Sequence, residues 1–291
     1  MLAKLVLIAC MCLSAESLHL RSQPSRSHSR RVRNLALTDK TQYVPGSDGT
    51  YAQNYQDVWA AALAKHNGWD NGFFLDAGAY HGTECSNSAL LEKELGWTGI
   101  CVEPEPVGFE NRSCVMVARP LSHEEDKPIM FYGQGQIKHI GFRSWEDSPA
   151  DKGTEINTIT VAEIFRCLKM AQQEDYSQQK SEDCTRITGD IEIPSFINFV
   201  SLDVEGQESN VLSTFPWDEY KVGAWIVEQT VDQSRSAATC EESRQILRAH
   251  GYMQAPVENP GVDEYWVLPE YWSDELRKHE LRIHPAGSNG C

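Results

Sequence analysis

The stretch FFLDAGAYHG, residues 73–82, decides the fold. Its apolar run ends on Asp76, and Gly78 and Gly82 follow with three residues between them. This order is typical of a buried strand that ends in a tight turn, because glycine adopts backbone conformations that other residues avoid. We therefore predict the first strand-to-helix turn of an open α/β sheet, which is where such sheets bind cofactors.

Helical and strand-like patterns alternate along the rest of the chain. The strand-like runs are TGICVEP, SCVMVA, FINFVSLDV and VGAWIVEQ, and the helical runs are QNYQDVWAAALAKHNG, SNSALLEKEL, TITVAEIFRCL, GQESNVLSTF and TCEESRQILRAHG. The alternation predicts a mostly parallel sheet with helices on both faces. The last runs, YMQAPVE and DEYWVLP, predict an antiparallel pair. Thr160 with Glu163, and Thr239 with Glu242, have the spacing of capping boxes at two helix starts.

The chain divides into a leader, one domain and a tail. Residues 1–17 have the pattern of a signal peptide, and residues 18–40 form a basic Ser/Arg-rich leader that is typical of a transit segment. We predict one domain over residues 41–270 and a C-terminal helix and tail over residues 271–291. Insertions at about 123–150 and 171–190 interrupt the domain, the first β-rich and the second a polar loop.

The leader predicts entry into the secretory pathway. Secretion, residence in the lumen of the endoplasmic reticulum or Golgi, and delivery to a plastid through a bipartite leader all fit this pattern. A disordered tail that is never processed is the alternative. The apolar run of the leader is too short to span a bilayer, so no stable membrane span is predicted.

The formal net charge of −16 is unevenly distributed. Residues 1–40 carry seven Lys and Arg against two acidic residues, so the remaining chain is strongly acidic. An acidic body repels phosphate backbones, which argues against nucleic acid as a partner. The charge is compatible with a small molecule or a glycan.

Seven of the nine cysteines lie beyond the predicted signal peptide, and none forms a CxxC pair. Neither a zinc site nor a full disulfide framework is therefore indicated. Cys101 and Cys114 lie in apolar runs, where we predict buried thiols. Cys167 and Cys184 flank the polar insertion and would pair in an oxidising compartment. The sequon Asn111–Ser113 becomes relevant only on the secretory route.

Two acidic residues predict the kind of cofactor. A pyrophosphate needs three glycines in the pattern GxGxxG, whereas this turn has only GAYHG. Asp76 suits a ligand with a positive charge, and Glu103 ends the second strand at the position that binds ribose hydroxyls. S-adenosylmethionine carries an ammonium, a carboxylate and a sulfonium and fits this combination. The alternative for Asp76 is helix capping.

The chain resembles the FkbM-type S-adenosylmethionine-dependent methyltransferases over most of residues 51–268. The resemblance lies in YAQNYQD, FFLDAGAYHG, LGWTGICVEPEP, FENRSCVMVARPLS, INTITVAEIF, FINFVSLDVEGQESNVL and DEYWVLP. It implies a Rossmann-like class I methyltransferase fold: a seven-stranded, mostly parallel sheet whose last strand is antiparallel, with helices on both faces. Tyr80, His81 and the segment 119–122 depart from the family pattern, which affects the adenine contacts more than the fold.

The resemblance and the turn together give a set of candidate cofactor-binding residues. They are Gln53, Asp76, Gly78, Ala79, Gly82, Ser86, Asn87, Glu103 and Ser122. Gln53 belongs to the opening motif, which either folds over the cofactor or faces solvent.

Three acids are the candidate catalytic residues. Methyl transfer to a hydroxyl needs alignment and a proton acceptor, which we expect at the end of the fourth strand. Asp203 and Glu205 alternate there by two and so point the same way if the strand continues, and Glu228 ends the neighbouring strand. These three could also bind a divalent cation, but we favour a metal-free base because no histidine has a ligand position. Glu208 is interpreted as a first-turn acid of its helix.

The resulting prediction is an S-adenosylmethionine-dependent O-methyltransferase acting on a hydroxyl of a sugar, glycan or secondary metabolite. Two alternatives remain. One is a catalytically inactive methyltransferase fold that serves as an interaction protein of the secretory pathway. The other, an NAD-dependent oxidoreductase, is disfavoured by the two-glycine turn.

Overall fold

The computed structural model describes residues 50–134, 137–140, 153–172, 184, 186–229, 237–257, 260–273 and 276. The predicted signal peptide and basic leader lie outside these residues. So do parts of both predicted insertions and most of the tail after residue 271.

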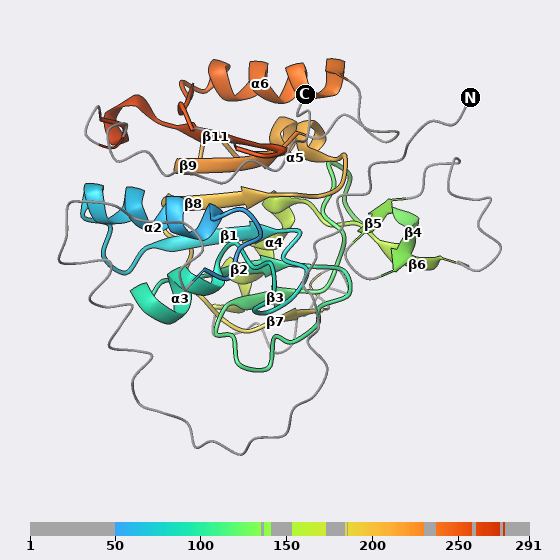
Figure 1. Ribbon diagram of the computed structural model, residues 1–291. Helices are drawn as coiled ribbons and strands as arrows, with labels where there is room; N and C mark the ends of the chain where they lie inside the picture. Colours follow the sequence, from blue (N-terminus) through green and yellow to red (C-terminus); the bar gives the residue numbers. More distant parts are fainter. Residues whose placement is uncertain are drawn as a thin grey trace, which may run out of the picture.

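An eight-stranded sheet in the order β10-β11-β9-β8-β1-β2-β3-β7 forms the centre of the molecule (Figure 1). Its strands are β1 (Phe73–Ala77), β2 (Thr98–Val102), β3 (Val115–Val117), β7 (Ile187–Thr188), β8 (Phe196–Leu202), β9 (Lys221–Glu228), β10 (Met253–Gln254) and β11 (Asp263–Val267). The five strands from β3 to β9 pair in parallel. The predicted α/β Rossmann-like class is therefore confirmed.

The antiparallel strands complete the sheet at both sides. β11 lies between β9 and β10 and runs antiparallel to both, as expected for the closing pair of runs. At the other edge β7 pairs antiparallel with β3. β7 comes from the segment that the sequence assigned to a polar loop, because a two-residue strand leaves too short a pattern to recognise.

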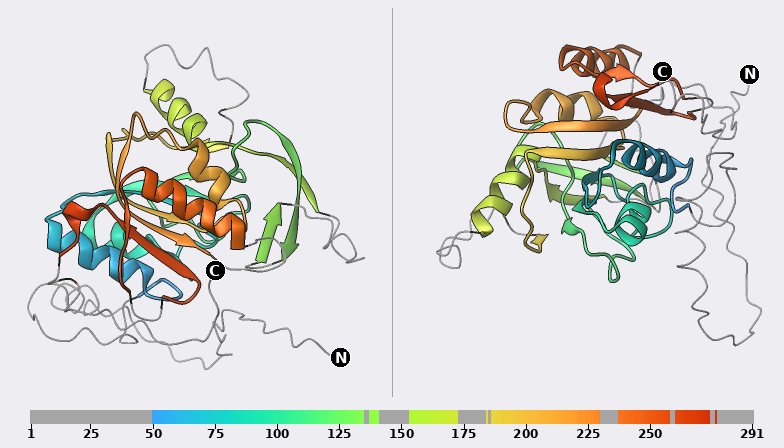
Figure 2. Two further views of the ribbon diagram at one scale, coloured as in Figure 1. Left: turned by 90° about the horizontal axis from the view of Figure 1, so that it is seen from above. Right: turned by 90° about the vertical axis from the view of Figure 1, so that its left-hand side faces the viewer.

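Helices cover both faces of the sheet (Figure 2). They are α2 (Gln56–Asn67), α3 (Ala89–Leu95), α4 (Val161–Ala171), α5 (Glu208–Thr214) and α6 (Ala237–Ala249). Apolar side chains of α2 and α3 belong to one buried cluster with Phe74 and Phe199, and those of α4, α5 and α6 belong to another with Leu75 and Val200. The alternation of β1 and β8 side chains thus provides one core on each face.

The N-cap hydrogen bond of one of the two predicted capping boxes is present. Thr160 caps α4, and its Oγ1 accepts a hydrogen bond from the backbone N–H of Glu163 at 3.1 Å. The second prediction is wrong, because α6 begins at Ala237 and Thr239 therefore lies inside the helix. Local spacing alone did not distinguish a cap from an early helical position.

The cysteine prediction was wrong for one pair. Cys101 and Cys114 form a disulfide, with a Cα–Cα distance of 6.0 Å, where we expected free thiols. Parallel pairing of β2 with β3 brings residue 101 opposite residue 116, and so places Cys114 within bridging distance. Cys167 and Cys184 are also disulfide-bonded, as the oxidising alternative required, and so is Cys240.

A second, three-stranded sheet has the order β5-β4-β6, with β4 (Pro128–Gln134), β5 (Ile137–Ile140) and β6 (Thr154–Asn157). It lies on the side of the molecule towards which β8 runs (Figure 1). Loops and insertions beside strand ends are where α/β folds commonly carry binding residues. Among the described residues, no helix has the length and apolar character that crossing a membrane requires.

Candidate functional site

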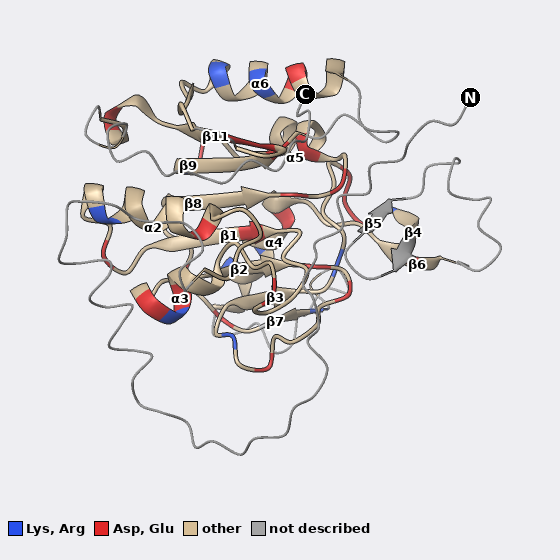
Figure 3. Cartoon of the chain, viewed as in Figure 1, with Lys and Arg blue, Asp and Glu red and all other residues tan. Residues whose placement is uncertain are grey.

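The candidate site lies where the parallel strands end. β1, β2, β8 and β9 run in the same direction, so the residues after their carboxyl ends meet at one edge of the sheet. Acidic residues follow β2 and β8 at this edge (Figure 3). The sequence-predicted acids Asp76, Glu103, Asp203 and Glu228 all belong to these strand ends.

The turn after β1 is built around two close backbone contacts. The N–H groups of Gly78 and Ala79 donate to the carbonyl oxygen of Val102 at 2.9 and 3.0 Å. A Cβ atom on Gly78 would lie 1.6 Å from the carbonyl oxygen of Asp203, and one on Gly82 would lie 2.0 Å from that of Gly108. Both glycines are therefore needed for close backbone contacts within the protein.

Asp76 lies beneath this turn. Its side chain is 2% exposed and accepts a hydrogen bond from the Ser88 hydroxyl at 2.5 Å. Burial raises the pKa of the Asp76 carboxyl, while the Ser88 hydrogen bond and the charge of Arg112 act in the opposite direction. Ser88 is the N-cap residue of α3. The carboxyl group thus connects β1 to the start of α3.

Arg112 supports the same turn, and sequence reasoning missed it. Its side chain is 1% exposed and pairs with Glu92 at 3.0 Å. The guanidinium also donates to the carbonyl oxygen of Gly82 at 2.9 Å, to Ser86 at 3.1 Å and to Ser88 at 2.9 Å. No local pattern marks this residue, because all of these partners lie 20 or more positions away.

Glu103 links the turns after β1 and β2. One carboxylate oxygen accepts the N–H of Tyr80 and the other accepts the N–H of Glu105, both at 3.0 Å. Its side chain is 7% exposed and lies at the end of β2, as predicted. A carboxylate held by two backbone amides has a fixed orientation, which is what recognition of a ribose would require.

Two further predicted residues lie between the turn and α3. Ser86 is 1% exposed, and its hydroxyl accepts the N–H of Ala89 at 3.1 Å. The Asn87 amide nitrogen donates to the Ser201 hydroxyl on β8 at 2.8 Å. The Asn87 carbonyl oxygen is buried and has no hydrogen-bond partner among the described residues. Such an acceptor is costly unless something donates to it, so Asn87 fits a ligand that carries a donor.

Two residues of the predicted contact region face other surroundings. Gln53 is exposed, whereas Gln56 in the same motif is buried and donates to Asp263 of β11 at 2.8 Å. His81 accepts the N–H groups of Thr83 and Glu84 through Nδ1, at 3.1 and 3.0 Å. The histidine therefore stabilises its own turn.

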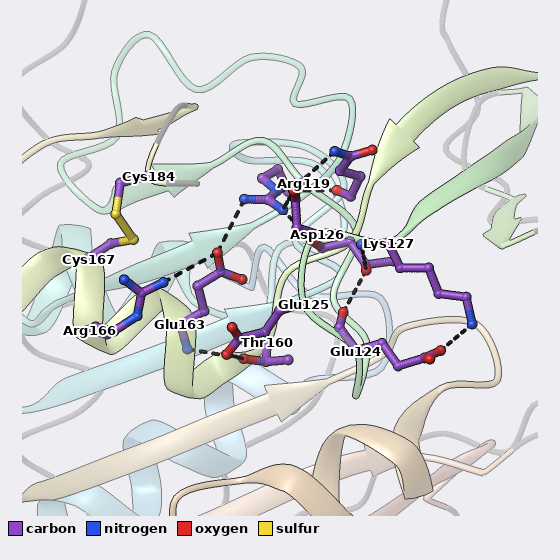
Figure 4. Close-up of polar contacts among 12 residues, drawn as sticks. Arg119, Glu124, Glu125, Asp126, Lys127, Thr160, Glu163, Arg166, Cys167 and Cys184 are labelled. Atoms are coloured by element: carbon purple, nitrogen blue, oxygen red, sulfur yellow. Dashed lines mark hydrogen bonds and ion pairs between the residues drawn. A yellow bond between two sulfur atoms is a disulfide. The ribbon is translucent and has the colours of Figure 1, made fainter. Parts of the chain in front are cut away.

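A buried arginine holds the segment that carries Ser122 (Figure 4). Arg119 is 3% exposed, donates to the carbonyl oxygen of Asn157 at 3.2 Å and pairs with Asp126 and Glu163 at 3.2 and 3.7 Å. Beside these contacts the N–H of Ser122 donates to the carbonyl oxygen of Ile159 at 2.9 Å. The ion pair between Arg119 and Glu163 thus fixes segment 119–122, which departs from the family pattern, to the start of α4.

The acidic group differs from the prediction by one member. Oxygen atoms of Asp203, Glu208 and Glu228 lie within 4.8 Å of one another. Glu205 is not part of this group, because β8 ends at Leu202 and Glu205 adopts a left-handed backbone conformation with φ 53°. The assumed alternation along the strand therefore stops before Glu205.

Glu208 takes the place of Glu205. Its side chain is 2% exposed, and one carboxylate oxygen accepts the N–H groups of Val204 and Gly206 at 3.0 and 3.1 Å. Three carboxylates this close offer either a proton acceptor or the oxygen ligands of a hard divalent cation. The group could serve either chemistry.

Comparison with known families agrees with this geometry. A family model, the methyltransferase FkbM domain, matches residues 76–253, from the end of β1 to the start of β10. No curated protein and no solved structure matched the sequence. The family match covers more than half of the 291 residues and includes every member of the acidic group. The chain therefore belongs to the FkbM methyltransferase family.

Proposed function

We propose that this methyltransferase uses S-adenosylmethionine and methylates a hydroxyl group of a sugar, a glycan or a small secondary metabolite. The observation that carries the proposal is the acidic group formed by Asp203, Glu208 and Glu228 at the carboxyl edge of the sheet, within the FkbM match. A carboxylate at this position is suited to accept the proton that a hydroxyl loses when it is methylated.

The residues around the turn after β1 suit the proposed cofactor. The buried Asn87 carbonyl oxygen would accept a hydrogen bond from its ammonium, and Glu103 would accept hydrogen bonds from the ribose hydroxyls. The backbone around them is shaped or supported by Gly78, Ala79, Gly82, Ser86 and Ser122. Hydrogen bonds of Asp76 and Arg112 support the same turn from beneath. The cofactor supplies an activated methyl group, so the protein needs only to align the acceptor and remove a proton.

Asp203 is the residue that we assign as the base. It follows β8 directly and is only partly buried, whereas Glu208 is engaged with two backbone N–H groups. An oxygen atom of Asp203 lies within 4.8 Å of oxygen atoms of Glu208 and Glu228. We favour this metal-free assignment, although the same oxygen atoms could bind a divalent cation.

The base assignment predicts a loss of rate without a loss of binding. Asp203→Asn should bind S-adenosylmethionine with wild-type affinity in calorimetry and transfer methyl groups roughly 100-fold more slowly or worse. Glu205→Gln is the matched control, because it changes a nearby acid outside the group and should retain most of the rate. A wild-type rate for Asp203→Asn would remove the assignment.

The methyl acceptor can be identified from the mass that it gains. An extract incubated with the protein and isotopically labelled cofactor should contain one product whose mass increases by a methyl group, as detected by mass spectrometry.

Calorimetry with S-adenosylmethionine and with NAD distinguishes the proposed function from its two alternatives. Binding of S-adenosylmethionine alone supports the methyltransferase, binding of neither cofactor supports an interaction protein, and binding of NAD supports the oxidoreductase.

We also propose that the chain enters the secretory pathway, as its leader predicts, and is then secreted, retained in the lumen or delivered to a plastid. Disulfides at Cys101–Cys114 and Cys167–Cys184, and a further one at Cys240, support an oxidising compartment. Fusing residues 1–40 to a fluorescent reporter tests this proposal by the compartment in which fluorescence appears.

A further inference from the structure

The loop between β2 and β3 contains the sequon Asn111–Ser113 and is held at both ends. Glu103 fixes its start, and the Cys101–Cys114 disulfide ties its end back to β2. Between these points the N–H of Arg112 donates to the carbonyl oxygen of Phe109 at 3.0 Å, which closes a turn. The sequon therefore lies in a turn of defined conformation.

The side chains of the sequon alternate between the interior and the solvent. Arg112 points inward, where its 1% exposed side chain pairs with Glu92. Asn111 and Ser113 on either side of it are both exposed. The backbone N–H of Ser113 donates to Glu92 at 2.7 Å, and this contact does not involve its hydroxyl group. Within the described part of the chain, neither the Asn111 amide nor the Ser113 hydroxyl has a hydrogen-bond partner.

These are the two groups that N-glycosylation requires. The Asn111 amide is the acceptor, and the third residue of the sequon must carry a hydroxyl. Because the contacts that anchor the turn come from Arg112, the Ser113 backbone and the disulfide, a glycan on the exposed Asn111 side chain would extend into solvent without displacing a buried contact. In this turn the residue whose side chain makes the structural contacts is thus buried, and the two residues that glycosylation requires are exposed.

We propose that Asn111 carries an N-linked glycan. In this step the amide nitrogen of Asn111 forms a bond to C1 of an oligosaccharide. The bond from C1 to the pyrophosphate of its lipid carrier breaks, and the amide loses one proton. The inference rests on the proposed secretory route and not on methyl transfer.

From the position of the Cys101–Cys114 disulfide we infer the order in which the glycan is added and the disulfide closes. Asn111 lies inside the loop that the Cys101–Cys114 bond closes, three residues before Cys114. A closed loop restricts the extended conformations that an acceptor segment can adopt. Transfer therefore precedes closure of the disulfide. Cys101→Ser should raise the fraction of glycosylated chains if wild-type occupancy is incomplete, and should not lower it in any case.

The test uses the full chain, with its own leader, expressed in eukaryotic cells. The intact mass should exceed that of the polypeptide by one glycan, and treatment with a peptide-N-glycosidase, which hydrolyses the side-chain amide, should remove the glycan and convert Asn111 to Asp. Asn111→Gln and Ser113→Ala should both abolish the shift, whereas Ser113→Thr, which preserves a hydroxyl group, should keep it.

A second arm replaces the leader with a signal peptide of established function. An unmodified Asn111 in exported, disulfide-bonded protein from both arms would overturn the proposal. Glycosylation only in the second arm would also overturn it for the native chain, because the native leader would then fail to deliver it. Methyl transfer by Asn111→Gln should equal that of the wild type, which separates this inference from the proposed activity.

Discussion

Gly78 has only a hydrogen atom as its side chain, and this allows β1 and β8 to end side by side. Gly78 has φ 82°, and a Cβ there would lie 1.6 Å from the carbonyl oxygen of Asp203. The same residue determines how near the turn comes to the proposed base. At the residue scale, the missing side chain of Gly78 therefore serves both the close packing of the backbone and the position of the turn relative to the proposed base.

Gly78→Ala should destabilise the protein more than a left-handed conformation alone explains. Gly68→Ala is the matched control, since Gly68 has φ 65° but nothing within 4 Å of its Cβ position. The control should cost about 1 kcal/mol in the free energy of unfolding, and Gly78→Ala at least 1 to 3 kcal/mol more, owing to the collision. Urea unfolding measures both values. Equal costs would show that the contact with Asp203 is unimportant.

Asp76 predicts a pH dependence of stability. Burial raises the pKa of its carboxyl above the ordinary value of 3.8. The folded state therefore binds a proton more tightly than the unfolded state, so this stabilisation is complete below pH 3.8 and is lost as the pH rises through the folded pKa. Asp76→Asn keeps the size and an acceptor for Ser88 but cannot ionise.

The free energy of unfolding of the wild type, minus that of Asp76→Asn, should consequently fall as the pH rises from acid towards neutral. Urea unfolding at a series of pH values measures this difference. Parallel curves for the two proteins would show that the carboxyl has an ordinary pKa.

At the scale of elements, the β2–β3 loop joins a disulfide to the turn of the site. The Cys101–Cys114 bond fixes the end of the loop, and Arg112 within it donates to Gly82, Ser86 and Ser88. Disruption of the bond should therefore loosen the turn that we expect to bind the cofactor.

Replacing both Cys101 and Cys114 by Ser should lower the free energy of unfolding by about 3 kcal/mol and weaken binding of S-adenosylmethionine. The control replaces Cys167 and Cys184, whose bond closes a span of similar length, 17 residues against 13. It should cost similar stability, but calorimetry should find its cofactor affinity unchanged. Equal losses of affinity in both variants would contradict a specific role for the loop.

Sequence patterns predicted the elements that carry long local signals. FFLDAG, FINFVSLDV and VGAWIVEQ gave β1, β8 and β9, since continuous apolar runs are typical of strands buried on both faces. β7 and the Cys101–Cys114 bond were missed because both depend on pairing between strands. The capping signal of Thr239 failed because α6 starts two residues before this good cap residue.

At the scale of the whole molecule, parallel strands explain why part of the candidate site was predictable. Asp203 and Glu228 end adjacent strands, so the topology brings them together. The change from Glu205 to Glu208 was not predictable, since it depends on the φ angle of one turn residue. The role of Arg112 likewise depends on partners in residues 82–92, which lie 20 or more positions away along the chain.

The position of β11 has a consequence for how the protein is made. This strand occupies a place between β9 and β10, although it is the last of the three to leave the ribosome. Until residues 263–267 emerge, the nascent polypeptide keeps one side of β9 without its hydrogen-bonding neighbour, and such an edge invites aggregation. Completion of the sheet must therefore await residues 263–267, and a premature stop before residue 263 would leave β9 with an unpaired edge.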